Sequence, residues 1–399
     1  MARKIRLGVV GLGRAFTLML PTFVADERVE LAGAADPRIE ARRRFESEFG
    51  GRAYDSIEPL CDDRTIEAIY VASPHQFHAE HVRIAATAGK HVLVEKPMAL
   101  SIDDCQSMIA AARSARVQLV IGHSHSFDAP ILRTRELIVS GAFGRVRMLT
   151  ALNFTDFIYR PRRPEELSTR EGGGVIFSQA AHQIDVVRLL AGGLVRTVRA
   201  FTGQWDRSRA TEGAYSALLH FDGDAFASLT YSGYAHFDSD ELCGDIGELG
   251  QPLDPSRHGA ARRALASVRS PAEEAELKAS RGYGGAQQQI ARLPLGMTAG
   301  LPHHQHFGFV VASCERGDLR PMPDGVLIYG DLEVRTESLP PPMIPRREVI
   351  DELYDAVVHG RSPLHGGEWA LATTEVCLAL LQSANERREI ALQHQVACA

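Results

Sequence analysis

The chain has 399 residues, of which 45% are hydrophobic and 24% charged, and its formal net charge is −6. This length suggests two domains, and the composition is that of an ordinary globular protein. The acidic balance gives no reason to expect nucleic acid as a partner, and no segment approaches the roughly eighteen apolar residues of a membrane span. The six cysteines form no CxxC pair, so we expect reduced thiols and a cytoplasmic protein.

The first 122 residues alternate between short apolar runs and amphipathic stretches. Strands are expected at Ile5–Val10, Val29–Ala34, Ala68–Ala72, His91–Val94 and Gln118–Ile121. Helices are expected between them, at Phe16–Ala25, Ile39–Phe49, Phe77–Thr87 and Ile102–Ser114. This alternation predicts right-handed βαβ units and therefore an α/β domain, residues 1–122, with a doubly wound parallel sheet of the Rossmann type.

From residue 123 onward, strand-like runs follow one another with few helices between them. They lie at Val146–Leu152, Val195–Phe201, Tyr215–Phe221, Ala225–Tyr231, Phe307–Cys314 and Val326–Tyr329. We expect a second, α+β domain over 123–399 with an open, mainly antiparallel sheet. Residues 238–306, with a helix pattern at His258–Ser280, interrupt the strands and are interpreted as an insertion. Helical spacing returns at Arg347–His359 and Glu368–Asn385.

The opening stretch joins an apolar run, Leu7–Val10, to two glycines spaced G-x-G and then to a segment able to start a helix. This is the context of the dinucleotide fingerprint. Gly11 permits the tight turn, and the missing Cβ of Gly13 lets the backbone approach a pyrophosphate at the helix N-terminus. Phe16 stands in the third glycine position, so the motif is incomplete. Asp36 follows about twenty residues later, where an acidic side chain accepts hydrogen bonds from the adenosine ribose.

Other polar clusters also follow the ends of predicted parallel strands, where ligands bind in such sheets. Asp36 repels a 2′-phosphate while Arg38 partly offsets that repulsion, so NAD is expected to be preferred modestly over NADP. The residues expected to bind the cofactor are Gly11, Gly13, Arg14, Ala15, Phe16, Asp36, Arg38, Ser73, Pro74, His75, His78, Glu95 and Lys96.

Two further stretches carry a family resemblance. Ala72–His78 reads ASPHQFH and Ala88–Pro97 reads AGKHVLVEKP, and they are followed by Gly172–Gly174 with His182 and Asp185. Together these motifs resemble the glucose–fructose oxidoreductase and inositol 2-dehydrogenase family, and the resemblance runs along nearly the whole chain. It implies a nucleotide-binding domain joined to an open antiparallel sheet, in agreement with the pattern of predicted elements.

The segments 123–130, 159–167 and 231–240 resemble one branch of this family, whose members oxidise the 4,5-dihydrodiol of phthalate. A small aromatic dicarboxylate is therefore the expected partner. Arg160 and Arg163 are candidate substrate ligands, because guanidinium groups bind carboxylates bidentately. A solvated basic loop, balanced by neighbouring glutamates, is an equally open interpretation of these arginines.

Lys96 and His182 are the catalytic candidates. Lys96 ends a parallel strand, and burial beside an oxidised nicotinamide would lower the pKa of its ammonium group towards that of a proton acceptor. His182 can accept a hydroxyl proton as hydride leaves the same carbon. The family usually has an aspartate four residues before this histidine, where this chain has Ser178. The usual polyol charge relay is therefore in doubt, and the change suits an anionic substrate.

The remaining substrate candidates are His123 and His125, which follow the last parallel strand, and Gln179, which shares a predicted helix face with His182. The histidines near residue 304 lack metal-ligand spacing, and no metal is expected. A sugar or inositol dehydrogenase and a non-catalytic NAD-binding regulator remain as alternatives. The resemblance implies a homodimer or homotetramer formed through the C-terminal sheet.

Overall fold

The computed structural model describes residues 3–285 and 302–398. They form two compact units, neither of which is continuous in the sequence. The first unit comprises Met1–His123, Ala275–Ala299 and Met343–Leu371, and the second comprises Ser124–Glu274, Gly300–Pro342 and Ala372–Ala399. Among the described helices, none combines the length and apolar character that crossing a membrane requires.

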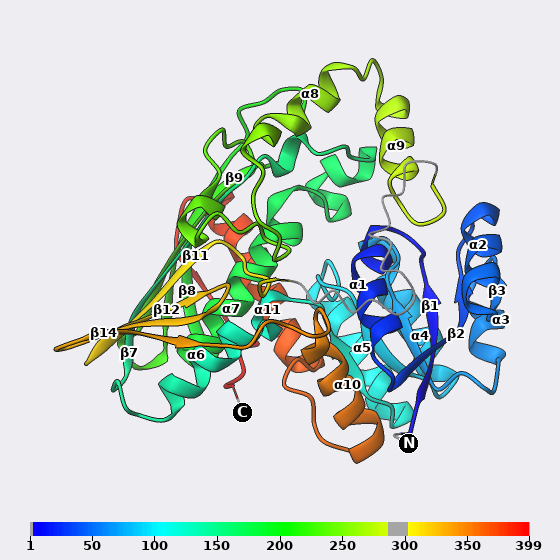
Figure 1. The fold of residues 1–399 in the computed structure, drawn as a ribbon, viewed down its shortest axis with the longest axis horizontal. Coiled ribbons are helices and arrows are strands. Elements are labelled where there is room, and N and C mark those ends of the chain that lie inside the picture. Colours follow the sequence, from blue (N-terminus) through cyan, green and yellow to red (C-terminus); the bar gives the residue numbers. More distant parts are fainter. Residues whose placement is uncertain (1–2, 286–301, 399) are drawn as a thin grey trace. The chain divides into compact units, whose positions relative to one another are not determined.

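The first unit contains a six-stranded parallel sheet in the order β3-β2-β1-β4-β5-β6, which confirms the predicted Rossmann-type sheet (Figure 1). Its strands are β1 (Ile5–Val10), β2 (Val29–Ala35), β3 (Arg52–Tyr54), β4 (Ala68–Val71), β5 (His91–Val94) and β6 (Leu119–Ile121). Its helices are α1 (Arg14–Ala25), α2 (Ile39–Phe49), α3 (Ile57–Asp62), α4 (His78–Thr87), α5 (Ile102–Ala115) and α10 (Arg347–His359).

Local sequence accounts for most of these elements. Ser101 accepts a hydrogen bond from the Asp104 backbone N–H and thereby caps α5. Apart from the short edge strand β3, the strands are almost entirely buried, and α3, α4 and α5 share one apolar core with them. The sequence pattern missed β3 and α3, because three and six residues are too few to show a hydrophobic period.

The second unit contains a nine-stranded sheet in the order β14-β13-β12-β11-β7-β10-β9-β8-β15 (Figure 1). Only β7 and β10 pair in parallel, so the sheet is mainly antiparallel, as predicted. The strands are β7 (Val146–Phe154), β8 (Val195–Gly203), β9 (Ala214–Phe221), β10 (Phe226–Ser232), β11 (Phe309–Cys314), β12 (Gly317–Met322), β13 (Gly325–Gly330), β14 (Val334–Ser338) and β15 (Ile390–Ala391).

The two faces of this sheet differ in their side chains. Helices α6 (Ala129–Val139) and α7 (Ala181–Ala191) pack against β12, β13 and β7, and buried residues alternate with exposed ones along β9. Strand register places six exposed apolar side chains on one face: Met148, Phe201, Leu218, Phe226, Tyr329 and Val334. Each of them is at least 37% exposed.

The expected insertion does lie between two strands, β10 and β11. The single helix pattern expected at 258–280 is wrong, since the structure has α8 (Ala260–Ala266) and α9 (Pro271–Ser280) instead. Pro271 provides the reason, because proline interrupts a helix but is favourable at the first position of the next one. Residues 286–301 of the expected insertion lie outside the described residues. The last helix, α11, spans Gly367–Glu386.

Candidate active site

The glycine turn has the geometry of a pyrophosphate site. Gly11 has a φ of +93°, and a Cβ there would lie 2.7 Å from the Ala72 carbonyl oxygen, so only glycine fits. Gly13 is the N-cap of α1, and among the described residues no side chain caps it and no atom lies within 4 Å of its Cβ position. The first N–H groups of α1 and the helix dipole therefore face open space that suits an anion.

Asp36 holds the glycine turn in place. Its Oδ2 accepts a hydrogen bond of 2.7 Å from the Leu12 N–H, and its Oδ1 accepts from the Arg38 backbone and Nε at 2.9 and 3.0 Å. Only 5% of Asp36 is exposed. The carboxylate thus organises the turn as well as standing where the adenosine ribose is expected.

Phe16 departs from its predicted role as a cofactor ligand. Its side chain is 0% exposed, so only its backbone can take part in cofactor binding. Arg14 is exposed and Ala15 half-buried, and both lie at the open N-terminal turn of α1.

His78 also departs from the expected cofactor contact. Its ring is fully buried, with Nδ1 2.9 Å from the Pro97 carbonyl oxygen and Nε2 2.9 Å from the Ser73 carbonyl oxygen. Burial lowers the pKa of His78 to about 4, so the ring is neutral at pH 7 and one of its nitrogens donates. His78 therefore packs between the loop after β4 and the loop that carries Lys96, and its single N–H donates to one of them.

Glu95, which precedes Lys96, is hydrogen-bonded to Tyr70, a residue that sequence reasoning missed. The Tyr70 hydroxyl donates a 2.5 Å hydrogen bond to Glu95 Oε1. Burial raises the pKa of Glu95, while Tyr70 and the charges of Lys96 and Arg346 act in the opposite direction. The carboxyl group is thus positioned within the protein, which supports an orienting role for Glu95 beside Lys96.

In the second unit, His182 and His125 lie together although they come from different elements. His182 is on the first turn of α7, and His125 is in the 3₁₀ turn His125–Phe127 before α6. Their ring centroids are 4.8 Å apart, and Phe307 lies 5.0 Å from both rings. The two histidines are 7% and 3% exposed. The structure therefore brings a predicted catalytic residue and a predicted substrate ligand into one cluster.

Asp185 explains why the two histidines meet. Its Oδ2 accepts a 2.5 Å hydrogen bond from Ser126 Oγ, next to His125, and its Oδ1 accepts one of 2.9 Å from Thr373 Oγ1. Asp185 is one helical turn from His182 on α7. These bonds tie α7 to the turn before α6 and to α11.

His125 is charged at neutral pH because acidic groups surround it. Its Nδ1 is 2.7 Å from Asp128 Oδ2, and its Nε2 is 3.7 Å from Glu248 Oε1. Burial lowers the pKa of His125, but the two carboxylates outweigh burial and raise it to about 9. Burial likewise raises the pKa of Glu248, and the cations His125 and Arg160 overcome this and lower it to about 2. His125 therefore acts here as a buried cation.

The glycine triplet precedes a π-helix at Ile176–Ala180, so α7 begins only at Ala181 and the expected continuous α-helical face from Ser178 is wrong. A Cβ on Gly173 would lie 2.5 Å from the Glu166 backbone, and one on Gly174 would lie 2.2 Å from the Glu212 carboxylate. This close packing leaves no room for side chains. Gln179 is buried within the π-helix. π-Helical turns are frequent at functional sites.

Arg160 is the arginine closest to the histidine cluster. Its Nη1 is 4.0 Å from Glu248 Oε2, and its Nε donates to Asp156 Oδ1 at 3.2 Å. Both distances are long for charge-assisted bonds, and the side chain is 46% exposed. Arg160 and His125 thus share Glu248 as a counterion.

The two neighbouring arginines are occupied elsewhere in the unit. The guanidinium of Arg162 lies 3.6 Å above the Phe157 ring, and its Nη2 donates to the Phe157 carbonyl at 2.7 Å. The Arg163 Nε is 2.9 Å from Glu165 Oε1. Arg163 therefore has the balanced-loop environment that the sequence left open.

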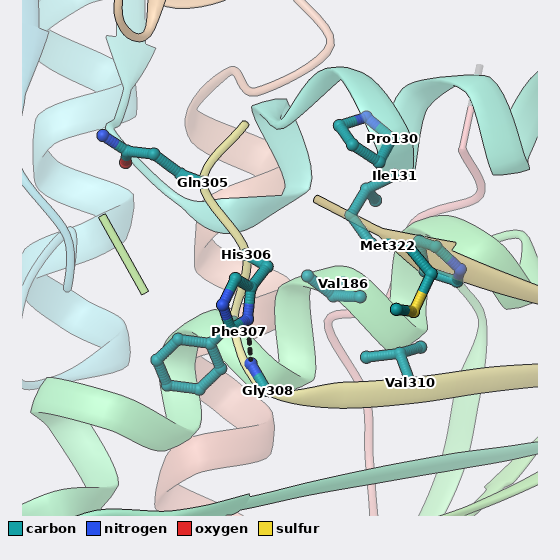
Figure 2. A pocket seen from close by; sticks show the side chains of 10 residues that line it. Pro130, Ile131, Val186, Gln305, His306, Phe307, Gly308, Val310 and Met322 are labelled. Carbon is teal, nitrogen blue, oxygen red and sulfur yellow. Dashed lines mark hydrogen bonds between the residues drawn. The ribbon is translucent and has the colours of Figure 1, made fainter. Parts of the chain in front are cut away.

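A small, mostly apolar hollow lies next to the histidine cluster. Figure 2 shows Ile131 of α6, Val186 of α7 and Met322 around it, together with His306 and Phe307. His306 Nε2 is 2.8 Å from the Ile246 carbonyl, and its Nδ1 accepts a 3.1 Å hydrogen bond from Gly308 N–H. The three histidines near residue 304 have separate partners, since His303 is hydrogen-bonded to Asp324 and His304 to the Pro340 carbonyl.

Sequence reasoning also missed Asp128, Glu248 and Phe307. Asp128 had a local signal, since it follows His125 by three residues across a turn. Glu248 and Phe307 reach the cluster from distant parts of the chain and carry no motif.

Comparison with known proteins identifies the family. Residues 5–123 match the NAD-binding Rossmann domain of the GFO/IDH/MocA oxidoreductase family, and residues 131–250 match a GFO/IDH/MocA C-terminal domain. The chain belongs to this family. The resemblance inferred from the motifs is thereby confirmed, and so is NAD as the cofactor of this oxidoreductase.

Three relatives illustrate its place in the family. It is 49% identical over 384 residues to 1-carboxy-3-chloro-3,4-dihydroxycyclohexa-1,5-diene dehydrogenase of Comamonas testosteroni, covering 95% of this chain and 94% of that one. Myo-inositol 2-dehydrogenase of Thermotoga maritima is 29% identical over 198 residues, covering 49% and 58%. A crystal structure of a protein from Bordetella bronchiseptica RB50, described as a dehydrogenase, has a TM-score of 0.90 at 41% identity, covering 98% and 100%.

Replacing Glu248 with Gln is expected to destabilise the protein in a pH-dependent way. His125 has a pKa of about 9 in the folded protein and about 6.5 in the unfolded chain. Its ion pair therefore stabilises the folded protein fully below pH 6.5, and this stabilisation is lost as the pH rises through about 9. The lowered pKa of Glu248 contributes stability above its unfolded value of about 4.3, lost as the pH falls through about 2. The Glu248→Gln variant should therefore melt about 2 °C below wild type at pH 6.

Calorimetry at pH 6 and pH 10 measures this difference, which should be smaller at pH 10 because His125 is then neutral. Glu241→Gln, on an exposed residue of the same segment, is the control. Equal losses at both pH values would contradict the ion pair.

Proposed function

We propose that the protein oxidises a cis-dihydrodiol of an aromatic carboxylate with NAD, giving the aromatic diol. The observation that supports this most is the pair of cations, His125 and Arg160, beside His182 in the second unit. Such a pair suits a substrate carboxylate, whereas neutral sugars and polyols do not call for one. The relative from Comamonas testosteroni, whose name describes a carboxylated cyclohexadiene diol, supports the same class.

The reaction balances without a further reactant. NAD accepts a hydride from the carbon that bears one hydroxyl, and Lys96 or His182 takes the proton from that hydroxyl. The resulting hydroxydienone loses its ring proton and regains one on oxygen, so an aromatic diol forms. Since aromatisation drives this last step, the protein need not bind the product tightly.

The number of carboxylates on the substrate distinguishes two versions of this proposal. Phthalate 4,5-dihydrodiol, the substrate suggested by the sequence, carries two vicinal carboxylates, and binding them would take both Arg160 and His125. A monocarboxylate dihydrodiol such as that in the name of the Comamonas relative needs only one cation, leaving the other for Glu248. We retain phthalate 4,5-dihydrodiol as the proposal and the monocarboxylate as its rival.

A spectrophotometric assay of NADH formation tests the proposal. The cis-dihydrodiols of phthalate and of 3-chlorobenzoate are compared with myo-inositol and glucose at equal concentrations. We expect kcat/KM to be highest for a carboxylated dihydrodiol. Higher turnover of inositol or glucose would assign the protein to the polyol dehydrogenases, and no turnover of any substrate would favour a non-catalytic regulator.

Lys96→Ala should abolish turnover while leaving NADH binding intact. Loss of a positioned proton-transfer group typically lowers kcat by about a hundredfold or more. Kinetics and fluorescence titration with NADH measure the two properties separately, with Lys4→Ala, on an exposed lysine, as the control. A variant that kept most of the wild-type kcat would assign Lys96 to structure alone.

Arg160→Ala should raise KM for the carboxylated dihydrodiol by roughly one to three orders of magnitude, because truncating one partner of a charge pair costs 2–5 kcal/mol. The KM of a cis-dihydrodiol without a carboxylate should barely change. Arg163→Ala is the matched comparison, since Glu165 already neutralises it, and its effect should be smaller. If Arg160→Ala leaves both KM values unchanged, the loop takes no part in carboxylate recognition.

We also propose that a second copy of the chain covers the exposed face of the nine-stranded sheet, giving a homodimer or homotetramer. Apolar side chains exposed on one face of four adjacent strands, β7, β10, β9 and β8, suit an interface between subunits. Leu218, which is 56% exposed, lies on this face in β9, between β10 and β8.

Leu218→Asp should therefore lower the molar mass measured by light scattering during gel filtration, because a buried unpaired carboxylate at the interface opposes association. The same substitution at Leu332, which is 99% exposed at the turn before β14, should leave the mass unchanged. An unchanged mass in Leu218→Asp would exclude this face as the main interface.

A further inference from the structure

Tyr283, just after α9, is anchored in the first unit although it belongs to the expected insertion. Its side chain is 0% exposed, and its hydroxyl donates a 2.6 Å hydrogen bond to Glu48 at the end of α2. Its ring meets Phe16 edge-on at 5.1 Å, and the Arg44 guanidinium lies 5.0 Å from the ring centroid. Phe16, in the third glycine position of the motif, therefore provides a docking surface for this tyrosine.

The backbone around Tyr283 is fixed just as closely. Gly284 has a φ of +80°, and a Cβ there would lie 3.0 Å from the Ala41 Cα in α2. The carbonyl oxygen of Tyr283 accepts a 3.3 Å hydrogen bond from Arg38 Nη1. The segment thus reaches the loop that follows β2, where the adenosine ribose of a dinucleotide binds.

The guanidinium of Arg38 is held by three groups. Its Nε and Nη2 donate to the two oxygens of Asp36 at 3.0 and 3.1 Å, Nη2 also donates to the Leu12 carbonyl at 2.7 Å, and Nη1 donates to Tyr283. The guanidinium is therefore directed towards Asp36 and the glycine turn. To bind a 2′-phosphate, it would have to break these bonds and leave the Asp36 carboxylate beside the phosphate dianion.

We propose that the Tyr283 segment is a positioning element for cofactor selectivity, which locks Arg38 onto Asp36 and so withholds its guanidinium from the 2′-phosphate of NADP. In most settings an arginine two residues after the acidic position would favour NADP, because guanidinium groups bind phosphate well. Here the contacts of Tyr283 with Phe16 of α1 and Glu48 of α2 fix its carbonyl oxygen beside Arg38 Nη1, which opposes an outward turn of the guanidinium. The insertion thereby makes the protein selective for NAD at a position where the sequence alone gives opposing signals.

The test is the binding of NADH and NADPH to the full chain, measured by fluorescence titration without substrate. In Tyr283→Ala, the backbone carbonyl remains but the ring no longer anchors it against Arg38, so the ratio of the NADPH Kd to the NADH Kd should fall by roughly tenfold, as when a charge-assisted hydrogen bond is lost. NADH binding itself should change much less. An unchanged ratio in a folded variant would overturn the proposal.

A double-mutant cycle separates selectivity from general loosening. If Tyr283 acts through Arg38, Tyr283→Ala should have no effect on the Kd ratio in an Arg38→Ala background, and an equal effect there would overturn the proposal. Tyr354→Ala, on a half-buried tyrosine of α10 in the same unit, is the control for the substitution. Should Tyr283→Ala not fold, Tyr283→Phe removes the hydroxyl anchor alone and should lower the ratio about twofold. An unchanged ratio in that variant would overturn the proposal.

Discussion

The buried carboxylate of Asp185 is the constraint on which the second unit's site depends. A buried charge is tolerated only when its oxygens are hydrogen-bonded, and the donors here are Ser126 and Thr373. Thr373 in turn accepts from Arg188, which is itself 0% exposed. Because Ser126 follows His125 directly, satisfying this carboxylate also fixes the distance between the two histidine rings. The hydrogen bonds of the buried Asp185 carboxylate therefore position the two histidines of the site.

The histidine cluster also shows how the chain replaces a missing carboxylate. Ser178 occupies the position at which the family's usual aspartate stands. The negative charge near the histidines comes instead from Asp128 and Glu248, which both lie close to His125. These carboxylates keep His125 cationic, which suits anion binding. A substrate carboxylate would compete with Glu248 for His125 and Arg160, which ties specificity to the insertion that carries Glu248.

The sequence predicted what depends on short-range patterns. Buried parallel strands and their turns, such as β1 with Gly11, show in local apolar runs and in a glycine that no other residue can replace. Prediction from the sequence failed where contacts join distant segments. Glu248 and Tyr283 reach their sites from the insertion, and no periodic pattern marks them. Phe16 was misjudged for the same reason, since only its partner Tyr283 explains why a bulky ring fills a glycine position.

The most direct test of the account is to follow the hydrogen that leaves the substrate. A carboxylated cis-dihydrodiol, deuterated at the ring carbons that bear the hydroxyls, is oxidised with unlabelled NAD, and the NADH is examined by NMR. The account predicts one deuterium at C4 of the nicotinamide, on a single face of the ring, together with the aromatic diol. NADH without deuterium, or diol formed without NADH, would contradict hydride transfer from the diol carbon.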